Sequence, residues 1–292
     1  MRLTTKIIAG IILSIFLLSL LFIIGYSFTD RKNYNLSFAN HTINIPQEDK
    51  TGIDIEPFRV LVFKVEQSDI DNRFYYNFTN EKNGLFIHPA TTPDEENKLF
   101  IPEVLNDFIS IQTSNDTLTI KIKFDEVREK YAKMNEALEK RQLPGVGYGI
   151  YVSGVNLYLH TSNINVINKL NDIQTQIINM KTDSVKIYSS GDINIDSCKA
   201  AVMEPNTNRK LTVKNSEAKT IYMDLDRTRK WNIDGCVIEE QNVTGSGRHD
   251  ITFHRNETGK INWYPKNENA ELNLKFKGNA AQITYETQPV ND

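Results

Sequence analysis

The chain has 292 residues, enough for one large domain or two small ones beyond any targeting segment. Its 34 basic residues nearly balance 37 acidic ones, and a net charge of −3 argues against a nucleic-acid partner, which usually requires a basic face. Two cysteines are too few for a disulfide framework or a zinc site. Frequent Asn, Thr, Ile and Tyr favour strands and turns over a helical bundle.

Residues 7–25 carry no charge and are almost wholly apolar. As a helix this run covers roughly 28 Å, close to the hydrocarbon thickness of a bilayer. Arg2 and Lys6 precede it, and the positive-inside tendency keeps such an N-terminus in the cytoplasm. The sequence predicts a cytoplasmic tail (1–6), a transmembrane signal-anchor (7–28) and a body outside the cytoplasm, periplasmic or extracellular.

A cleaved signal peptide is the alternative interpretation of the same segment. Gly25-Tyr26-Ser27 is a weak small-x-small cleavage site, although the apolar run is longer than the usual signal-peptide core of about 7–15 residues. In that case the mature protein would be secreted to the periplasm without an anchor.

Residues 29–55 are polar and are predicted as a spacer before a β domain that covers 56–292. The first part of this domain, 56–155, contains short apolar runs that predict strands, with a loop from Pro89 to Asn97. The predicted strands are Arg59–Val65, Arg73–Phe78 as its possible partner, Leu85–Ile87, and a hairpin of Phe108–Gln112 and Leu118–Ile122 turning at Asn115-Asp116.

One segment has a helical period. Between Asp125 and Gln142, apolar residues fall on one helix face and Pro144-Gly145 ends the pattern. We expect this helix to cap one end of the β body; a partner-binding amphipathic helix is the alternative.

A repeat of short alternating runs begins after residue 155. Their last members are separated by steps of 18, 18, 18, 20, 20 and 21 residues: Leu159, Ile177, Ile195, Val213, Ile233, Phe253 and Leu274. A second set begins with Val185, Met203 and Ile221, also 18 apart, and continues less evenly through Ile238, Ile261 and Ile283. Such a period predicts stacked coils, and we expect a parallel β-solenoid of about seven coils over 156–288. An antiparallel sandwich is the alternative.

The predicted corners contain residues that adopt tight turns cheaply, including Asn179, Asn215 and Gly235. The fragments Asn194–Cys198 and Asn232–Cys236 recur two periods apart, so their cysteines should lie roughly 9–10 Å apart. A disulfide requires Cα atoms within about 7 Å, so we predict that Cys198 and Cys236 are not bridged and pack at a corner.

The layout from about Glu56 to Glu286 resembles the bacterial putative auto-transporter adhesin (head-GIN) domain family common in Bacteroidota. The resemblance rests on Phe58–Val62, on Phe108–Ile122, and on Ser-Gly corners such as Ser153-Gly154, Ser190-Gly191 and Ser246-Gly247. Corners poor in glycine and the inserted helix after Phe124 depart from the family pattern. The resemblance implies a β-coil fold and an envelope location, with no catalytic residues to transfer.

No nucleophile elbow, Walker loop, zinc-protease motif or dinucleotide fingerprint is present. His249 and His254 flank Asp250, and a metal or acid–base role would need both on one face; surface histidines are the simpler interpretation. Asp196, Lys214, Asp234 and His254 fall at equivalent repeat positions. We interpret them as charge complementarity between strands, with polysaccharide-cleaving chemistry as the alternative.

The charged stretch Asp224–Lys230 is predicted as a solvated loop between coils. Tyr188, Tyr222, Trp263 and Tyr264 could stack on sugars if exposed, although packing is the simpler role.

These features predict a membrane-anchored, non-enzymatic β-solenoid module for adhesion, binding or envelope scaffolding. Its predicted partners are the membrane, through the N-terminal helix, and an envelope protein or glycan. No cofactor, metal, catalytic residue or disulfide is predicted. The alternatives are a carbohydrate-active β-helix enzyme, either a lyase or a hydrolase, and an accessory protein of envelope sensing.

Overall fold

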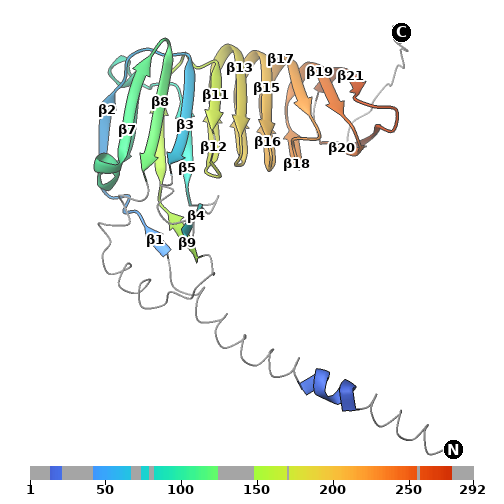
Figure 1. Cartoon of the computed structure of the whole chain (residues 1–292). Coiled ribbons are helices and arrows are strands. Elements are labelled where there is room, and N and C mark those ends of the chain that lie inside the picture. Colours follow the sequence, from blue (N-terminus) through green and yellow to red (C-terminus); the bar gives the residue numbers. More distant parts are fainter. Residues whose placement is uncertain are drawn as a thin grey trace, which may run out of the picture.

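The computed structural model describes residues 14–21, 42–66, 74–78, 82–123, 148–169, 171–254 and 257–277. Two long sheets face each other and form the body, with a small third sheet beside one end (Figure 1). This arrangement confirms the mostly β, parallel solenoid architecture. The predicted helix at 125–142 and most of the predicted anchor at 7–28 lie outside the described residues.

The first long sheet has ten strands. In spatial order they are β2 (Lys50–Asp54), β6 (Lys98–Pro102), β10 (Asn156–His160), β5 (Gly84–His88), β12 (Gln174–Ile178), β14 (Ile193–Asp196), β16 (Lys210–Lys214), β18 (Lys230–Asp234), β20 (Arg248–His254) and β22 (Glu271–Lys277). From β10 to β22 every neighbouring pair is parallel.

The second long sheet has nine strands. In spatial order they are β21 (Glu257–Pro265), β19 (Val237–Gly245), β17 (Glu217–Asp224), β15 (Lys199–Thr207), β13 (Lys181–Ser189), β11 (Val166–Lys169), β3 (Val60–Glu66), β8 (Thr117–Lys123) and β7 (Ile109–Ser114). The predicted hairpin is confirmed: β7 and β8 pair antiparallel, and both Asn115 and Asp116 have positive φ at its turn.

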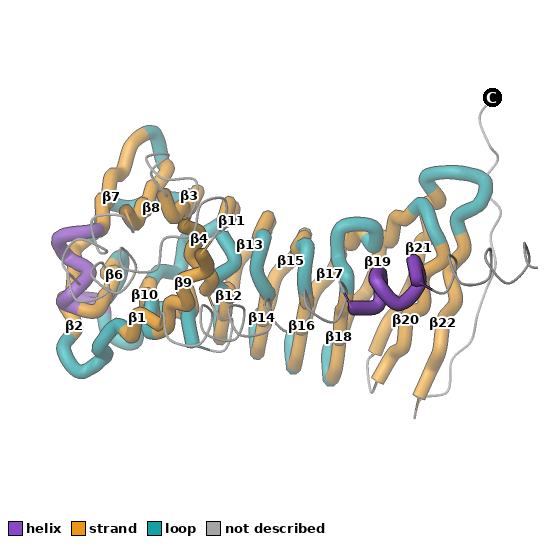
Figure 2. Tube along the Cα trace, turned by 60° about the horizontal axis from the view of Figure 1, so that its bottom comes forward, coloured by secondary structure: helices purple, strands orange, loops and turns teal. Residues whose placement is uncertain are grey.

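Five consecutive coils run from β12 to β21, each made of one strand from each sheet (Figure 2). The number of described coils is lower than the predicted seven for two reasons. At one end, strands from the N-terminal part join the sheets: β5 lies between β10 and β12, and β3 lies between β8 and β11. At the other end, β22 follows β20, and its predicted second strand at Ile283 lies outside the described residues. Leu159 and Ile177, which are 18 residues apart in the sequence, therefore do not lie on adjacent strands. Ile87 of β5 lies between them and pairs with both.

The remaining strands, β1 (Thr42–Asn44), β9 (Tyr148–Ser153) and β4 (Phe74–Phe78), form the small parallel sheet. The predicted pairing of 73–78 with 59–65 is wrong, since β4 pairs with β9 while β3 pairs with β8 and β11. Two short 3₁₀ turns, η1 (Pro93–Glu95) and η2 (Glu103–Phe108), flank β6.

The core consists of inward side chains stacked in register between the two long sheets. Ile177, Ile195, Val213 and Ile233 follow one another in adjacent strands, and each is at most 2% exposed. The predicted column places Leu274 next to Phe253, and this last step is wrong. Leu274 pairs with Ile251, whereas the partner of Phe253 is Phe276. In the second sheet Ile221 is followed by Gln241, whereas Ile238 pairs with Ala218.

The corner after each first-sheet strand uses the same conformation. Asn179, Ser197, Asn215 and Gly235 have φ between 47° and 65°, one in each successive coil. The next residue in each coil points inward and is buried, giving a column of Met180, Cys198, Ser216 and Cys236. Both cysteines are free thiols, and Ser216 lies between them in the stack.

Residues 14–21 form a helical segment whose aliphatic and aromatic side chains are largely exposed, Leu18 by 68% and Leu21 by 66%. Among the described ranges, no helix combines the length and apolarity needed to cross a bilayer.

Candidate binding surfaces

The predicted column of charged residues is present as a series of register pairs between adjacent strands. Asp196 pairs with Lys214, Lys214 with Asp234, and Asp234 with His254, each on an adjacent strand. The carboxylate of Asp196 accepts hydrogen bonds from Ser197 Oγ and Asn215 Nδ2, both at 3.0 Å. These contacts of Asp196 link the left-handed corners of two adjacent coils.

Of the two neighbouring histidines, His249 can be placed, whereas the side chain of His254 lies outside the described part of the structure. His249 Nε2 lies 3.1 Å from Asp226 Oδ1. Across the described part of the chain, no three His, Cys, Asp or Glu side chains are grouped closely enough to hold a metal ion.

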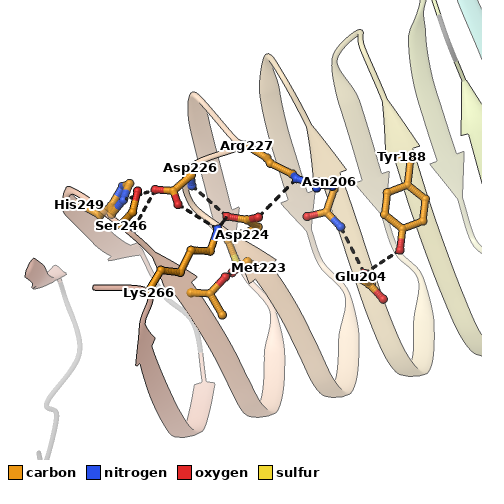
Figure 3. A network of polar contacts seen from close by, with 11 residues as sticks. Tyr188, Glu204, Asn206, Met223, Asp224, Asp226, Arg227, Ser246, His249 and Lys266 are labelled. Carbon is orange, nitrogen blue, oxygen red and sulfur yellow. Dashed lines mark hydrogen bonds and ion pairs between the residues drawn. The ribbon is translucent and has the colours of Figure 1, made fainter. Parts of the chain in front are cut away.

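A polar network joins three successive turns of the solenoid (Figure 3). Lys266 Nζ lies 2.7 Å from Asp224 Oδ1 and 2.9 Å from Asp226 Oδ2, and Arg227 Nε lies 3.5 Å from Asp224 Oδ2. The backbone N–H of Ser246 donates to Asp226 Oδ1 at 2.9 Å.

These contacts set the protonation of the network. The Ser246 N–H and the Lys266 ammonium hold the pKa of Asp226 well below its usual range, and the two carboxylates raise the pKa of Lys266. Asp226 therefore stays ionised and paired with Lys266 at neutral pH, which suits a cross-link between coils and not a proton donor.

The aromatic residues singled out in the sequence divide into two groups. Tyr222 and Tyr264 are 46% and 44% exposed on the outer face of the second sheet. Tyr188 donates its hydroxyl to Glu204 Oε1 at 2.8 Å, and this bond raises the pKa of the phenol (Figure 3). Trp263 packs against the core.

A cluster of rings on β5, β10 and β6 was not predicted from the sequence. Phe86 and Tyr158 stack with centroids 4.9 Å apart, and Lys50 Nζ lies 3.9 Å from the Tyr158 ring centre. His160 contacts the rings of His88 and Phe100. Burial is the main cause that lowers the pKa of His160, and the neighbouring His88 lowers it further. The cluster depends on β5 lying next to β10, a pairing that no local pattern reveals.

Lys169 is an unpredicted buried charge in the second sheet. It is 0% exposed, and its Nζ donates to Asn171 O at 2.7 Å, to Asn171 Oδ1 at 3.1 Å and to Ile173 O. Burial lowers the pKa of the ammonium from 10.5 to about 7. The group is closed to solvent and ties a corner together, so no substrate could reach it.

A concave site lies where the first sheet splits. The ladder between β18 and β20 consists of one pair, Asp234 with His254, whereas β16 pairs with β18 along its whole length. Figure 2 shows β20 inclined relative to β18. The resulting slot has a volume of about 400 Å³ and is lined by Lys210, Arg229, Lys230, Trp231, Asn232, Asp250 and Thr252.

The slot is basic on one side and polar on the other. Lys210 and Lys230 are register partners, and both are exposed together with Arg229. Asp250 and Thr252 come from β20, where Asp250 lies 3.5 Å from Lys275 Nζ. Trp231 occupies the same inward position as Leu211 of the preceding coil and is half-buried.

No protein-family model matches the chain, and no curated protein matches it. Solved structures with a similar course of the chain include a "putative adhesin" of Bacteroides fragilis, which is 11% identical with a TM-score of 0.46 and covers 80% of this chain and 100% of its own. A "putative lipid binding protein" of Parabacteroides distasonis is 11% identical with a TM-score of 0.37, covering 82% and 98%. A "putative adhesin" of Parabacteroides merdae is 9% identical with a TM-score of 0.32, covering 82% and 100%. All three TM-scores lie below 0.5, and these values assign the chain to no family.

Proposed function

We propose that the chain is a non-enzymatic binding module of the cell envelope, which uses the outer faces of its solenoid for adhesion, ligand binding or scaffolding. The observation that carries this proposal is the set of parallel ladders that run from β12 to β18 in the first sheet and from β13 to β21 in the second, which build two long outer faces. Regularly spaced side chains on such faces suit contact with an extended partner, either an envelope protein or a glycan.

The state of two surface carboxylates supports a binding role over the alternative of a hydrolase. A glycoside hydrolase needs one carboxyl group with a raised pKa to protonate the leaving group. The contacts of Asp226 and Glu95 shift both carboxyl pKa values in the opposite direction, downward. Two carboxylates of the network, Asp224 and Asp226, are bridged by Lys266.

We also propose that residues 7–28 anchor the module in the cell membrane with the N-terminus in the cytoplasm. The uncharged apolar run and its preceding Arg2 and Lys6 support this orientation. Membrane extraction by carbonate and by detergent, followed by the intact mass of the purified chain, tests it. Retention in carbonate with an uncleaved N-terminus is expected. A soluble chain that begins near residue 28 would favour the cleaved signal peptide.

A binding screen of the full-length chain in detergent micelles against glycans and envelope proteins tests the binding role. We expect specific retention of at least one class without turnover of the ligand. Cleavage of a bound polysaccharide, detected as new reducing or unsaturated ends, would replace the binding module with the enzyme. Co-purification with a membrane signalling protein alone would favour the sensing accessory role.

A further inference from the structure

The slot between β18 and β20 is a candidate site for a small ligand. We propose that it binds an acidic saccharide, with the anionic group on Lys210, Arg229 and Lys230 and the sugar ring against Trp231. This inference rests on the proposed binding role and names the ligand class and the place.

Among the residues that line the slot, three side chains are cationic and one, Asp250, is a carboxylate, which lies 3.5 Å from Lys275 Nζ. Of the ion pairs described, none involves the side chains of Lys210, Arg229 or Lys230. Because Lys210 and Lys230 are directly opposite on adjacent strands, their like charges disfavour the bare pair. A carboxylate or sulfate between them would remove this repulsion and form charge-assisted hydrogen bonds with the nearby guanidinium. The chain as a whole carries a net charge of −3, so the cluster is a local feature.

The other walls of the slot suit the uncharged part of a sugar. Trp231 packs against the core with one part of its side chain and lines the opening with the rest, which is half-buried. The part that lines the opening presents an apolar surface to the C–H groups of a sugar ring. Asn232, Asp250 and Thr252 supply polar side chains within reach of hydroxyl groups. A volume of about 400 Å³ falls within the range of about 300–1,000 Å³ that is typical of small-molecule sites.

The backbone around the slot adds hydrogen-bonding groups. The N–H of Lys230 donates to Arg209 O, toward β16. Successive residues of a strand direct their main-chain N–H and C=O groups to opposite sides. The N–H and C=O of Trp231 therefore point toward β20, and Trp231 is not paired with a residue of β20 in the described ladder.

The shape of the slot distinguishes a saccharide from an inserted peptide strand. An added strand would need β18 and β20 to stay about 9–10 Å apart along their length. The two strands instead rejoin at Asp234 and His254, so the opening is a wedge closed at one end. A compact ligand or the end of a chain fits this wedge, whereas a through-running strand does not.

Calorimetric titration of the full-length protein in detergent micelles tests the inference with trigalacturonate as the probe. Its fully methyl-esterified form is the matched uncharged ligand, and inorganic phosphate is the matched simple anion. We expect trigalacturonate to bind more tightly than both by about tenfold or more. Its affinity should fall as NaCl is raised from about 50 mM to about 300 mM.

The double variant Arg229→Gln with Lys230→Gln should weaken trigalacturonate binding by about tenfold or more, because it removes two of the three cations. Both side chains are exposed, so the fold should be kept. The matched control is Lys219→Gln with Lys260→Gln, which makes the same charge change on exposed positions of β17 and β21 and should shift affinity by less than about twofold.

Three results would overturn the inference: no trigalacturonate binding, equal binding by the double variant, or equal binding of phosphate. If trigalacturonate does not bind in the slot but the chain retains a neutral glycan or an envelope protein in the screen, the proposed binding role stands without this site. Tighter binding of an extended acidic peptide than of trigalacturonate would also overturn the inference and assign the slot to a chain end of a protein.

Discussion

At the scale of single residues, two buried threonines illustrate how polar groups behave inside the solenoid. Thr175 lies in the inward column between Leu85 and Ile193, and in the described structure its Oγ1 has no hydrogen-bond partner. Thr207 is equally buried, but its Oγ1 donates to Gly191 O and accepts the N–H of Arg209 at 3.1 Å. The Thr175 hydroxyl is therefore buried without a hydrogen bond, whereas the Thr207 hydroxyl links Gly191 and Arg209 at a corner of the coil.

We expect Thr175→Val to stabilise the protein by about 1 kcal/mol, because it removes an uncompensated hydroxyl at nearly constant volume. Thr207→Val, the matched variant, should destabilise it by about 1–2 kcal/mol through loss of the corner bonds. Urea-unfolding midpoints measure both changes. Equal effects of the two substitutions would show that the hydroxyl partners do not decide the outcome.

Lys169 should make stability depend on pH. Its pKa is about 7 in the folded chain and near 10.5 when unfolded, so between these values the unfolded chain binds more protons. The free energy of unfolding should therefore rise with pH from about 7 upward, by at most about 1.4 kcal/mol per pH unit from this group.

Urea unfolding between about pH 6.5 and 8.5 checks this slope. Lys169→Met should remove the slope contributed by this group, whatever its effect on absolute stability. Lys219→Met, at an exposed position, should keep the wild-type slope. Parallel curves for wild type and Lys169→Met would contradict the lowered pKa.

At the scale of elements, the repeated corner after each first-sheet strand sets the path of the coil. Ser197 has a φ of 55°, a left-handed conformation that costs a side-chain-bearing residue about 1–2 kcal/mol. Asparagine and glycine, which tolerate this conformation best, take the same place in three other coils, at Asn179, Asn215 and Gly235.

We expect Ser197→Val to destabilise the protein by about 1–2 kcal/mol, because a β-branched side chain fits the left-handed corner poorly. Ser197→Gly should stay within about 1 kcal/mol of wild type, since relief of strain offsets the added freedom of the unfolded chain. Thermal unfolding compares the two variants. A tolerated valine would mean that the corner can change its conformation.

At the scale of the whole molecule, a solenoid has ends where strands lack a partner. The strand β22 pairs with β20 along seven residues and covers Ile251, which is 1% exposed. Its loss would expose the backbone groups of β20, and an unprotected edge strand recruits other chains.

Deletion of residues 270–292 should therefore cause concentration-dependent association, measured by size-exclusion chromatography with light scattering. A chain that ends at Lys277 retains β22 and should associate less. A monodisperse 1–269 truncation would show that β20 is protected in another way.

The repetitive local pattern allowed much of the fold to be predicted from the sequence. The 18-residue steps fixed the inward column of Ile177, Ile195 and Val213, because a parallel coil places equivalent residues directly above one another. The hairpin turn at Asn115-Asp116 and the charge column from Asp196 to His254 follow from the same local rules.

Only the tertiary structure decided how distant segments join this repeat. The placement of β5 between β10 and β12, and of β4 beside β9, depends on which strand edges are free and complementary, information that no local period contains. The slot was missed for a related reason: each of its residues follows the repeat locally, and the opening lies where β18 and β20 pair at one position only. The sequence determined the coils, whereas packing between non-equivalent strands decided the surfaces that the coils present.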